Sequence, residues 1–267
     1  MNLIIFTELD EILFNPSEAD RQSIAAVVER LKQKQVPLIP ITSKTRAEVE
    51  PWLDEFSLTD PFIVERGSGI FIHRSDSRFN TSGTNQSDRY YIHQQGCSYT
   101  EARAALKAVQ EEINKILRGF GDMDESGIQA LIGGTQPAAR QAKAREFSEY
   151  FLTPNRLEIE QLQKVAVEYG FQIIAGDSLS LILGAGANIA RSIEWLKQKA
   201  IAESNIQTVG LGCTKRDLAM LETVDLPIVI PTAKNDSNFG DRNWQTANCA
   251  GVSGWIESIE QLCRQHL

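Results

Sequence analysis

Residues 3–13 read Leu-Ile-Ile-Phe-Thr-Glu-Leu-Asp-Glu-Ile-Leu, and this stretch decides the fold. The apolar start predicts a buried strand over residues 2–6. Glu8 and Asp10 follow with a spacing of two residues, which places both carboxylates on one side of an extended chain as it leaves the sheet. The stretch therefore predicts a buried strand that delivers two acidic side chains at its carboxyl end.

Strand and helix patterns alternate after this opening strand. The first third of the chain predicts helices over 18–34 and 45–56 and strands over 36–42, 61–65 and 69–72. The alternation returns from residue 188 and predicts helices over 188–202, 217–221 and 255–266 and strands over 207–211 and 227–230. Strands that alternate with helices are typical of βαβ units and of a parallel sheet.

The middle of the chain has a different pattern. Residues 74–88 are polar and predict a loop or boundary. Beyond it, the pattern predicts helices over 99–118, 124–131, 136–143 and 156–168 and strands over 145–152, 171–175 and 179–183. We therefore predict an α/β fold in which a parallel sheet core, residues 1–85 and 186–267, is interrupted by an inserted α+β cap domain at 86–185.

Composition limits the possible environments and partners. The chain has 267 residues, 42% of them hydrophobic, which is ample for a sizeable core. No apolar run is long enough to cross a bilayer, and the apolar start lacks the basic residues of a signal peptide. The four cysteines show no metal-type spacing, so we expect free thiols in a reducing cytoplasm. The net charge of −8 argues against nucleic acid and anionic membranes as partners.

Candidate functional residues follow three of the predicted strands. In a doubly wound sheet, ligands bind outside the carboxyl ends of the strands. Carboxylates there suit magnesium, and hydroxyls, helix N-terminal amides and cations suit phosphate oxygens. Each signal alone has an ordinary structural explanation, such as a helix cap or a solvated helix start. The candidates are Glu8, Asp10 and Asp217 as metal ligands and Thr42, Ser43, Lys44 and Lys215 as phosphate-binding residues.

Joined together, these segments resemble a known family. The opening stretch resembles the first motif of haloacid dehalogenase-like phosphatases, apolar-Asp-x-Asp-x-Thr. The following segments resemble mannosyl-3-phosphoglycerate phosphatases in a consistent order: Thr-Ser-Lys-Thr-Arg-Ala-Glu at 42–48, the strand pair at 62–72, Gly-Phe-Gly-Asp-Met at 119–123, Ala-Arg-Glu-Phe-Ser-Glu at 144–149, and Gly-Leu-Gly with Asp-Leu-Ala-Met-Leu at 210–221. The resemblance implies a Rossmann-like core with an α/β cap. It also implies hydrolysis of a phosphate monoester on a glycosyl glycerate or sugar phosphate, with Mg²⁺. It also implies that position 8 is the nucleophile and that Asp10 is the general acid and base.

The sequence departs from the family where the reaction would occur. Glu8 replaces the attacking Asp, Ile189 a lysine, and Cys213 a metal-binding Asp. The next two departures are Ile12 for the motif's Thr and Arg66 for an Asn. A displaced nucleophile can cost about a hundredfold in rate, and a thiol is a poor ligand for Mg²⁺. We therefore predict weak or lost activity and weak or lost Mg²⁺ binding.

The sequence leaves alternative functions open. One is a phosphatase with Glu8 as an altered nucleophile. Another is a non-catalytic homologue that binds a phosphorylated sugar or a protein and acts in regulation. A third is metal-free chemistry by Cys213, although no histidine or basic pair marks an activated thiol. Arg46, Arg66 and Arg145 are further candidate contacts for a carboxylate or phosphate. The oligomeric state is not encoded in any pattern of this chain.

Overall fold

The computed structural model describes residues 3–14, 16–201, 205–232 and 239–266. Within them, a nine-stranded sheet has the order β12-β11-β10-β1-β2-β3-β4-β6-β5. Its six strands from β12 to β3 are parallel, and β4, β6 and β5 continue the sheet in antiparallel pairs. The strands are β1 (Leu3–Glu8), β2 (Leu38–Ile41), β3 (Phe62–Val64), β4 (Gly69–His73), β5 (Asn85–Gln86), β6 (Tyr90–Gln94), β10 (Gln207–Gly212), β11 (Leu226–Val229) and β12 (Gln245–Thr246).

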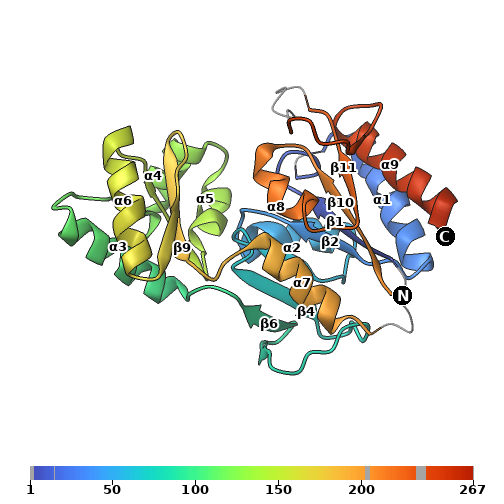
Figure 1. Ribbon diagram of the computed structural model, residues 1–267, viewed down its shortest axis with the longest axis horizontal. Helices are drawn as coiled ribbons and strands as arrows, with labels where there is room; N and C mark the ends of the chain where they lie inside the picture. The colour runs from blue at the N-terminus through green and yellow to red at the C-terminus, as the bar shows by residue number, and fades with distance from the viewer. Residues whose placement is uncertain (1–2, 15, 202–204, 233–238, 267) are drawn as a thin grey trace.

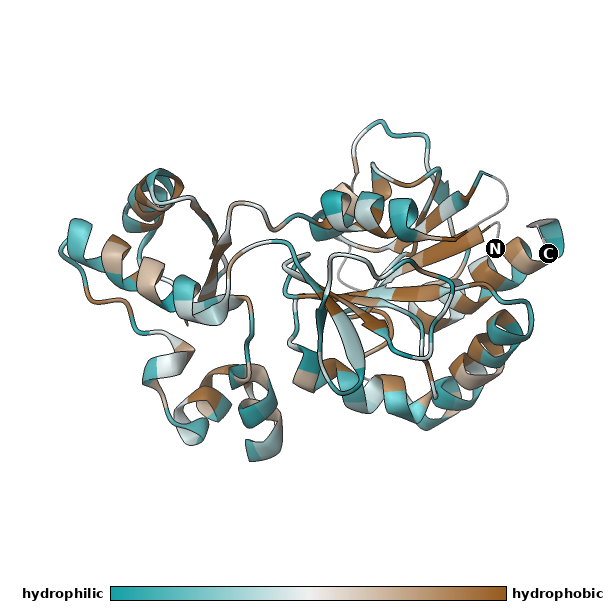
Figure 2. Ribbon diagram, turned by 90° about the horizontal axis from the view of Figure 1, so that it is seen from below, coloured by the Kyte–Doolittle hydropathy of each residue, from teal (hydrophilic) through white to brown (hydrophobic). Residues whose placement is uncertain are grey.

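Helices cover both faces of this sheet (Figure 1). One face packs against α1 (Glu18–Gln33), α2 (Arg46–Glu55) and α9 (Gly251–His266), and the other against α7 (Ile189–Lys199) and α8 (Leu218–Leu221). The predicted α/β class with a mostly parallel sheet is confirmed. Figure 2 shows the apolar strands between helices that present polar residues outward.

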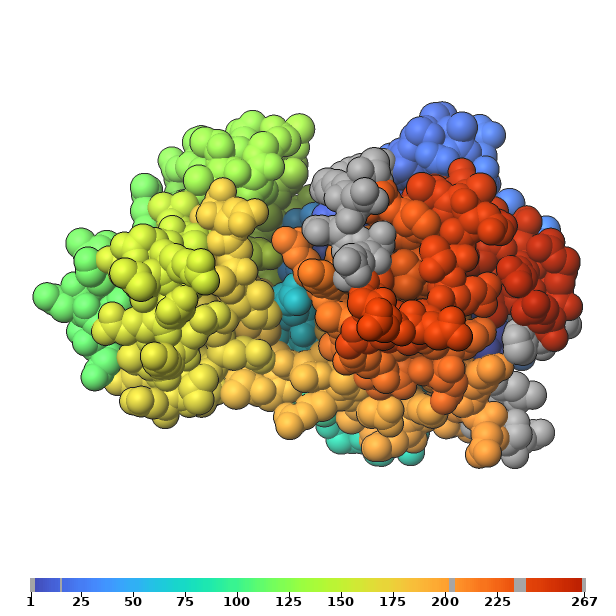
Figure 3. Space-filling model, turned by 45° about the horizontal axis from the view of Figure 1, so that its top comes forward, coloured from blue at the N-terminus to red at the C-terminus, as the bar shows by residue number. Residues whose placement is uncertain are grey.

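A second, three-stranded antiparallel sheet forms a smaller part of the molecule. Its order is β7-β9-β8, with β7 at Ser148–Leu152, β8 at Phe171–Ile174 and β9 at Leu179–Gly184. Its helices are α3 (Tyr99–Glu112), α4 (Glu125–Ile132), α5 (Gln136–Lys143) and α6 (Arg156–Glu168), with a short 3-10 helix η1 at Phe120–Asp122. A hollow lies between the two parts, and residues from the first third of the chain are visible in it (Figure 3).

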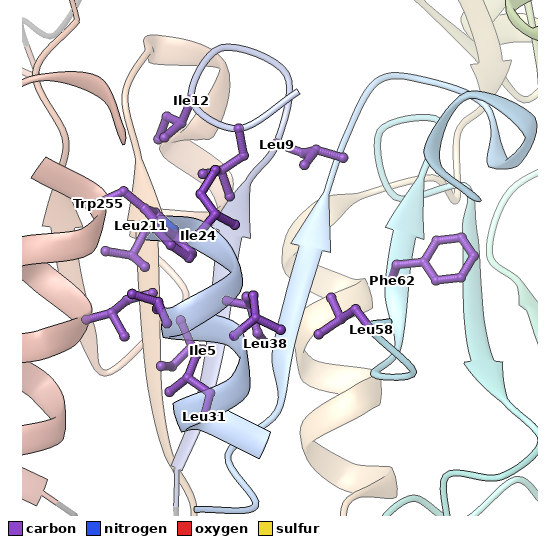
Figure 4. Close-up of a cluster of buried hydrophobic side chains, with 14 of the residues drawn as sticks. Ile5, Leu9, Ile12, Ile24, Leu31, Leu38, Leu58, Phe62, Leu211 and Trp255 are labelled. Atoms are coloured by element: carbon purple, nitrogen blue, oxygen red, sulfur yellow. The ribbon is translucent and has the colours of Figure 1, made fainter. Parts of the chain in front are cut away.

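The alternation of side chains along β1 explains why the larger core has two layers. Leu3 and Ile5 pack in the cluster with α1 and α9, whereas Ile4 and Phe6 pack in the cluster with α7. Successive side chains of a strand point to opposite faces, so a strand covered on both sides is apolar throughout. Figure 4 shows part of the first cluster, in which Trp255 of α9 lies close to Leu211 of β10.

The structure corrects some element bounds. The helix expected over 99–118 ends at Glu112, because Asn114 has a φ of 52° and the chain turns there. The segment expected to be a loop to residue 88 includes β5, and β6 then pairs with β4, so the nine-stranded sheet extends to Gln94. The helix expected at 217–221 begins with a 3-10 turn, η2 (Lys215–Asp217). The division into two domains at 86 and 186 stays a prediction.

Two expectations from composition concern the whole chain. All four cysteines are free, three of them buried and Cys249 exposed. Among the described residues, no helix has both the length and the apolar character that a bilayer crossing requires.

Candidate functional site

The carboxyl ends of β1, β2 and β10 surround one small cavity of about 40 Å³, which we call the carboxylate cavity. Glu8 ends β1, Thr42 follows β2, and Asp217 follows β10. The cavity is lined by Glu8, Asp10, Glu11, Ile41, Thr42, Ser43, Arg66, Ile189, Thr214, Arg216 and Asp217. The predicted acids and the predicted hydroxyl pair therefore lie at one place, although they come from three separate segments.

Glu8 is buried and its carboxylate turns back onto its own chain. Oε1 accepts hydrogen bonds from the backbone N–H groups of Asp10 and Glu11, the latter at 3.1 Å, and the thiol of Cys213 lies 3.7 Å from Oε2. Burial, together with the negative charges of Asp10 and Asp217, raises the pKa of Glu8 to about 9. Glu8 is therefore held as a neutral acid at neutral pH.

Asp10 is bound by the segment that follows β2. Its Oδ1 accepts a hydrogen bond from the hydroxyl of Thr42, and its Oδ2 accepts from the backbone N–H and the hydroxyl of Ser43, at 3.0 and 2.7 Å. Thr45 caps the N-terminus of α2 just beyond these residues. The segment that orients the Asp10 carboxylate is therefore itself held in place by the start of the helix. Asp10 is a preorganised carboxylate.

Asp217 closes the turn after β10. Its Oδ2 accepts hydrogen bonds from the backbone N–H groups of Cys213 and Thr214, at 2.9 and 2.8 Å, and from the Thr214 hydroxyl at 3.2 Å. Burial raises the pKa of Asp217 above its ordinary value, while these hydrogen bonds lower it. One of its oxygens is thereby used within the turn.

The donor set does not fit a magnesium centre as it stands. Mg²⁺ requires hard oxygen ligands in near-octahedral geometry. Oxygens of Glu8, Asp10 and Asp217 are engaged by local N–H and hydroxyl groups, and position 213 offers sulfur. In the part of the chain that the structure describes, no three His, Cys, Asp or Glu side chains are grouped so as to hold a metal ion.

The cations of the site match only in part those that the sequence singled out for a carboxylate or phosphate, since Arg66 is among them and Arg216 is not. Arg66 and Arg216 line the carboxylate cavity, whereas the exposed Lys215 does not. Lys44 lies in a neighbouring cavity, where its Nζ is 3.7 Å from Oε1 of Glu48. The phosphate-binding roles of Lys44 and Lys215 stay predictions. Arg216 was missed because a basic residue at a helix start reads as solvated surface.

The neighbouring cavity, which we call the cap cavity, has a volume of about 470 Å³ and lies between the two parts of the molecule. Ser43 lines both cavities, so they adjoin. Phe14, Lys44 and Glu48 line the cap cavity from the larger part; Phe120, Ile132, Gly133, Gly134, Ala138, Gln141, Ala142, Tyr150 and Leu179 line it from the smaller part. Aromatic faces with a few polar groups are typical of small-molecule sites.

A buried network joins the two parts beside these cavities. Glu65 of the larger part accepts hydrogen bonds from the backbone N–H groups of Glu146 and Phe147, at 2.8 and 3.2 Å, and from the hydroxyl of Ser148. Arg145 lies 3.4 Å from Glu65 and donates to the Ser43 carbonyl at 3.2 Å. No sequence pattern marks Glu65 as a functional residue, since its partners are about 80 residues away.

Known proteins match this chain over almost its full length. The chain is 31% identical to the glucosyl-3-phosphoglycerate/mannosyl-3-phosphoglycerate phosphatase of Persephonella marina, over 98% of both chains. It is 30% identical to the protein of the same name from Methanococcoides burtonii, over 98% of this chain and 97% of that relative. No protein-family model matches the chain.

A solved structure supports the fold independently. BT1666 of Bacteroides thetaiotaomicron, described among the phosphatases of the haloalkanoate enzyme superfamily, superposes with a TM-score of 0.65 at 12% identity. The superposition covers 98% of this chain and 96% of that one. The arrangement of the two sheets is therefore shared across a large sequence distance.

Proposed function

Because the chain belongs to the mannosyl-3-phosphoglycerate phosphatase family of haloacid dehalogenase-like hydrolases, we propose that it binds a phosphorylated glycosyl glycerate or related sugar phosphate and hydrolyses its phosphate monoester slowly. The observation that carries this proposal is the convergence of Glu8, Asp10 and Asp217 on one cavity beside Thr42 and Ser43. The family resemblance expected from the motifs is confirmed by the full-length relatives.

The chain's own residues take distinct roles in this proposal. Glu8 is the nucleophile, and Asp10, oriented by Thr42 and Ser43, moves the proton of the leaving oxygen. Thr42 and Ser43 follow β2 and face the cavity, where hydroxyl and N–H donors suit phosphate oxygens. Lys44 contributes charge from the adjoining cap cavity.

The slow rate follows from the state of Glu8. Its longer side chain folds back to the N–H groups of Asp10 and Glu11 instead of projecting into the cavity as a free carboxylate. A displacement of about 1 Å from in-line geometry costs about a hundredfold in rate. Protonation removes the negative charge that makes the carboxylate a nucleophile in most of the molecules at neutral pH. Both effects weaken attack without removing the substrate pocket.

Weak or absent Mg²⁺ binding is part of the proposal. Glu8, Asp10 and Asp217 would be the ligands, and the metal would neutralise charge on the phosphoryl group. The sulfur at Cys213 and the internal hydrogen bonds of Asp217 both oppose this. The two adjoining cavities suit a substrate with a phosphoryl end and a larger organic part, which a glycosyl glycerate phosphate has.

The test is a hydrolysis assay with mannosyl-3-phosphoglycerate, glucosyl-3-phosphoglycerate and an aryl phosphate. We expect slow turnover by the wild type, none by Glu8→Ala, and a rate about a hundredfold higher for the triple variant Glu8→Asp, Ile189→Lys, Cys213→Asp. Fast wild-type turnover that Glu8→Ala abolishes would show that the site is not impaired. Saturable binding without turnover in every variant would favour the non-catalytic alternative.

A further inference from the structure

Two arginines from separate elements line the carboxylate cavity. Arg66 lies in the turn after β3, and Arg216 lies in η2 after β10. No hydrogen bond or ion pair joins either guanidinium to any residue that the structure describes. Arg66 is half-buried and Arg216 is exposed. By contrast, Arg145 and Arg78, which are withdrawn from solvent, each lie within ion-pair distance of a buried carboxylate.

The unpaired state of Arg66 is unfavourable by itself. Its side chain is half-buried, and both burial and the positive charge of Arg216 lower its pKa. Asp10 and Asp217 attract it from the same cavity, but their oxygens already accept the hydrogen bonds described above. Two like charges beside one cavity, each with a full set of unused N–H donors, are stabilised when an oxyanion lies between them.

The backbone holds Arg66 in this position. Glu65, Arg66 and Gly67 have consecutive positive φ values of 49°, 60° and 88°. Such conformations cost about 1–3 kcal/mol at a non-glycine residue and concentrate at functional sites. A Cβ on Gly67 would lie 2.6 Å from the carbonyl carbon of Asn188, so the turn rests directly on the start of α7. The position of Arg66 is therefore set by the packing of its turn against α7, and not by an ion pair of its side chain.

The charge of the cavity also requires these cations. Besides the neutral acid Glu8, the carboxyl groups of Asp10, Glu11 and Asp217 line it, and Ile189 at the start of α7 adds no charge. A dianionic phosphoryl group entering there is repelled unless cations face it.

We propose that Arg66 and Arg216 together form the oxyanion clamp of this cavity and bind the phosphoryl group. The identification of that oxyanion as part of the substrate rests on the proposed function; the anion site itself does not. Bidentate N–H donors from two directions would fix the oxyanion above Asp10.

Binding of orthophosphate, measured by isothermal titration calorimetry, tests the clamp without any need for turnover. We expect Arg66→Gln and Arg216→Gln each to weaken orthophosphate binding about 10- to 100-fold, because the loss of a charge-assisted hydrogen bond has an effect of this size. The matched control is Arg191→Gln, which removes an exposed arginine of α7 that does not line the cavity; its binding should change less than about twofold. Ile189→Lys added to Arg66→Gln should restore part of the affinity, because it returns a cation to the same cavity.

The outcomes separate the two proposals. Loss of phosphate binding in the two glutamine variants supports the clamp even if the wild type hydrolyses nothing. Unchanged binding in both variants, with the wild-type melting temperature retained, overturns it, as does a wild type that binds no orthophosphate at millimolar concentration. If Arg66→Gln does not fold, the phosphate affinities of Arg216→Gln and Arg66→Lys test the clamp instead. Arg66→Lys should bind orthophosphate more weakly than wild type, because lysine lacks the bidentate donors of arginine.

Discussion

The thiol of Cys213 lies 3.7 Å from Oε2 of Glu8 and donates a hydrogen bond to it. Burial, and the acidic groups of Glu8 and Asp217 beside it, raise the pKa of the thiol far above its ordinary value. A thiol in that environment is a protonated donor and not a thiolate nucleophile. The contact therefore argues against metal-free chemistry by Cys213 and places a soft ligand where a hard one is needed for Mg²⁺.

A single substitution should expose this effect on metal binding. We expect millimolar Mg²⁺ to raise the melting temperature of the wild type by less than about 1 °C, and that of Cys213→Asp by several degrees, because a carboxylate adds hard oxygens to the cavity. Differential scanning fluorimetry measures each shift against the same protein without metal. Cys249→Asp is the control, since Cys249 is exposed and does not line the cavity. A wild type stabilised as much as Cys213→Asp would show that the native ligands suffice.

The raised pKa of Glu8 predicts a pH-dependent stability. The folded protein holds a proton on Glu8 up to about pH 9, whereas the unfolded chain releases it near 4.5, the ordinary pKa of a glutamate side chain. Between these values the native state binds the extra proton, so the stabilisation is present at low pH and is lost as pH rises. Glu8→Gln removes the titrating carboxyl group. As pH rises, the free energy of unfolding of Glu8→Gln relative to wild type should therefore grow by up to about 1.4 kcal/mol per pH unit. Urea unfolding at several pH values measures it, with Glu18→Gln on α1 as an exposed control. Parallel curves for wild type and Glu8→Gln would contradict the burial of a neutral Glu8.

The strand ends could be predicted because hydrophobic periodicity fixes where a strand stops. Glu8 closes the apolar run of β1, and Thr42 follows that of β2. The parallel order of the sheet then brings those ends together. What periodicity cannot supply is the direction of a side chain outside regular structure. Lys215 and Arg216 are adjacent in sequence, yet only Arg216 lines the cavity, because the 3-10 turn sets their orientations.

The contacts between the two parts of the molecule were equally inaccessible. Glu65 is one acidic residue after a strand, and its sequence neighbours give no hint that it accepts hydrogen bonds from residues 146–148. These hydrogen bonds depend on how the segment that contains residues 146–148 packs against the turn at Glu65. A strand pattern predicts that such a segment forms a strand, but not which of its residues contact the turn.

The buried network at Glu65 should matter more for stability than the surface pair beside it. Glu65→Gln leaves Arg145 without its buried counter-charge and replaces an acceptor oxygen by a donor. We expect a loss of about 3 kcal/mol in the free energy of unfolding, measured by urea denaturation. Glu146→Gln weakens the half-exposed pair with Arg46 (2.8 Å) and should cost less than about 1 kcal/mol. Equal losses from both substitutions would mean that the Glu65 network is no stronger than a surface ion pair.

The turn that presents Arg66 can be tested through Gly67 with a matched glycine elsewhere. Gly67 and Gly83 have similar φ values, 88° and 81°, but a Cβ on Gly67 would lie 2.6 Å from the Asn188 backbone, whereas one on Gly83 would meet nothing within 4 Å. Gly83→Ala therefore carries only the backbone cost of about 1 kcal/mol. Gly67→Ala adds a clash with the backbone at the start of α7, and this clash is relieved only if the turn moves.

We expect Gly67→Ala to lose about 2–4 kcal/mol of stability and to bind orthophosphate more weakly, because Arg66 moves with the turn. Gly83→Ala should keep wild-type affinity, since Gly83 lies in a loop that does not line the carboxylate cavity. If Gly67→Ala destabilised the protein no more than Gly83→Ala, the turn would not rest on α7 as the structure has it, and the placement of Arg66 would lose its support.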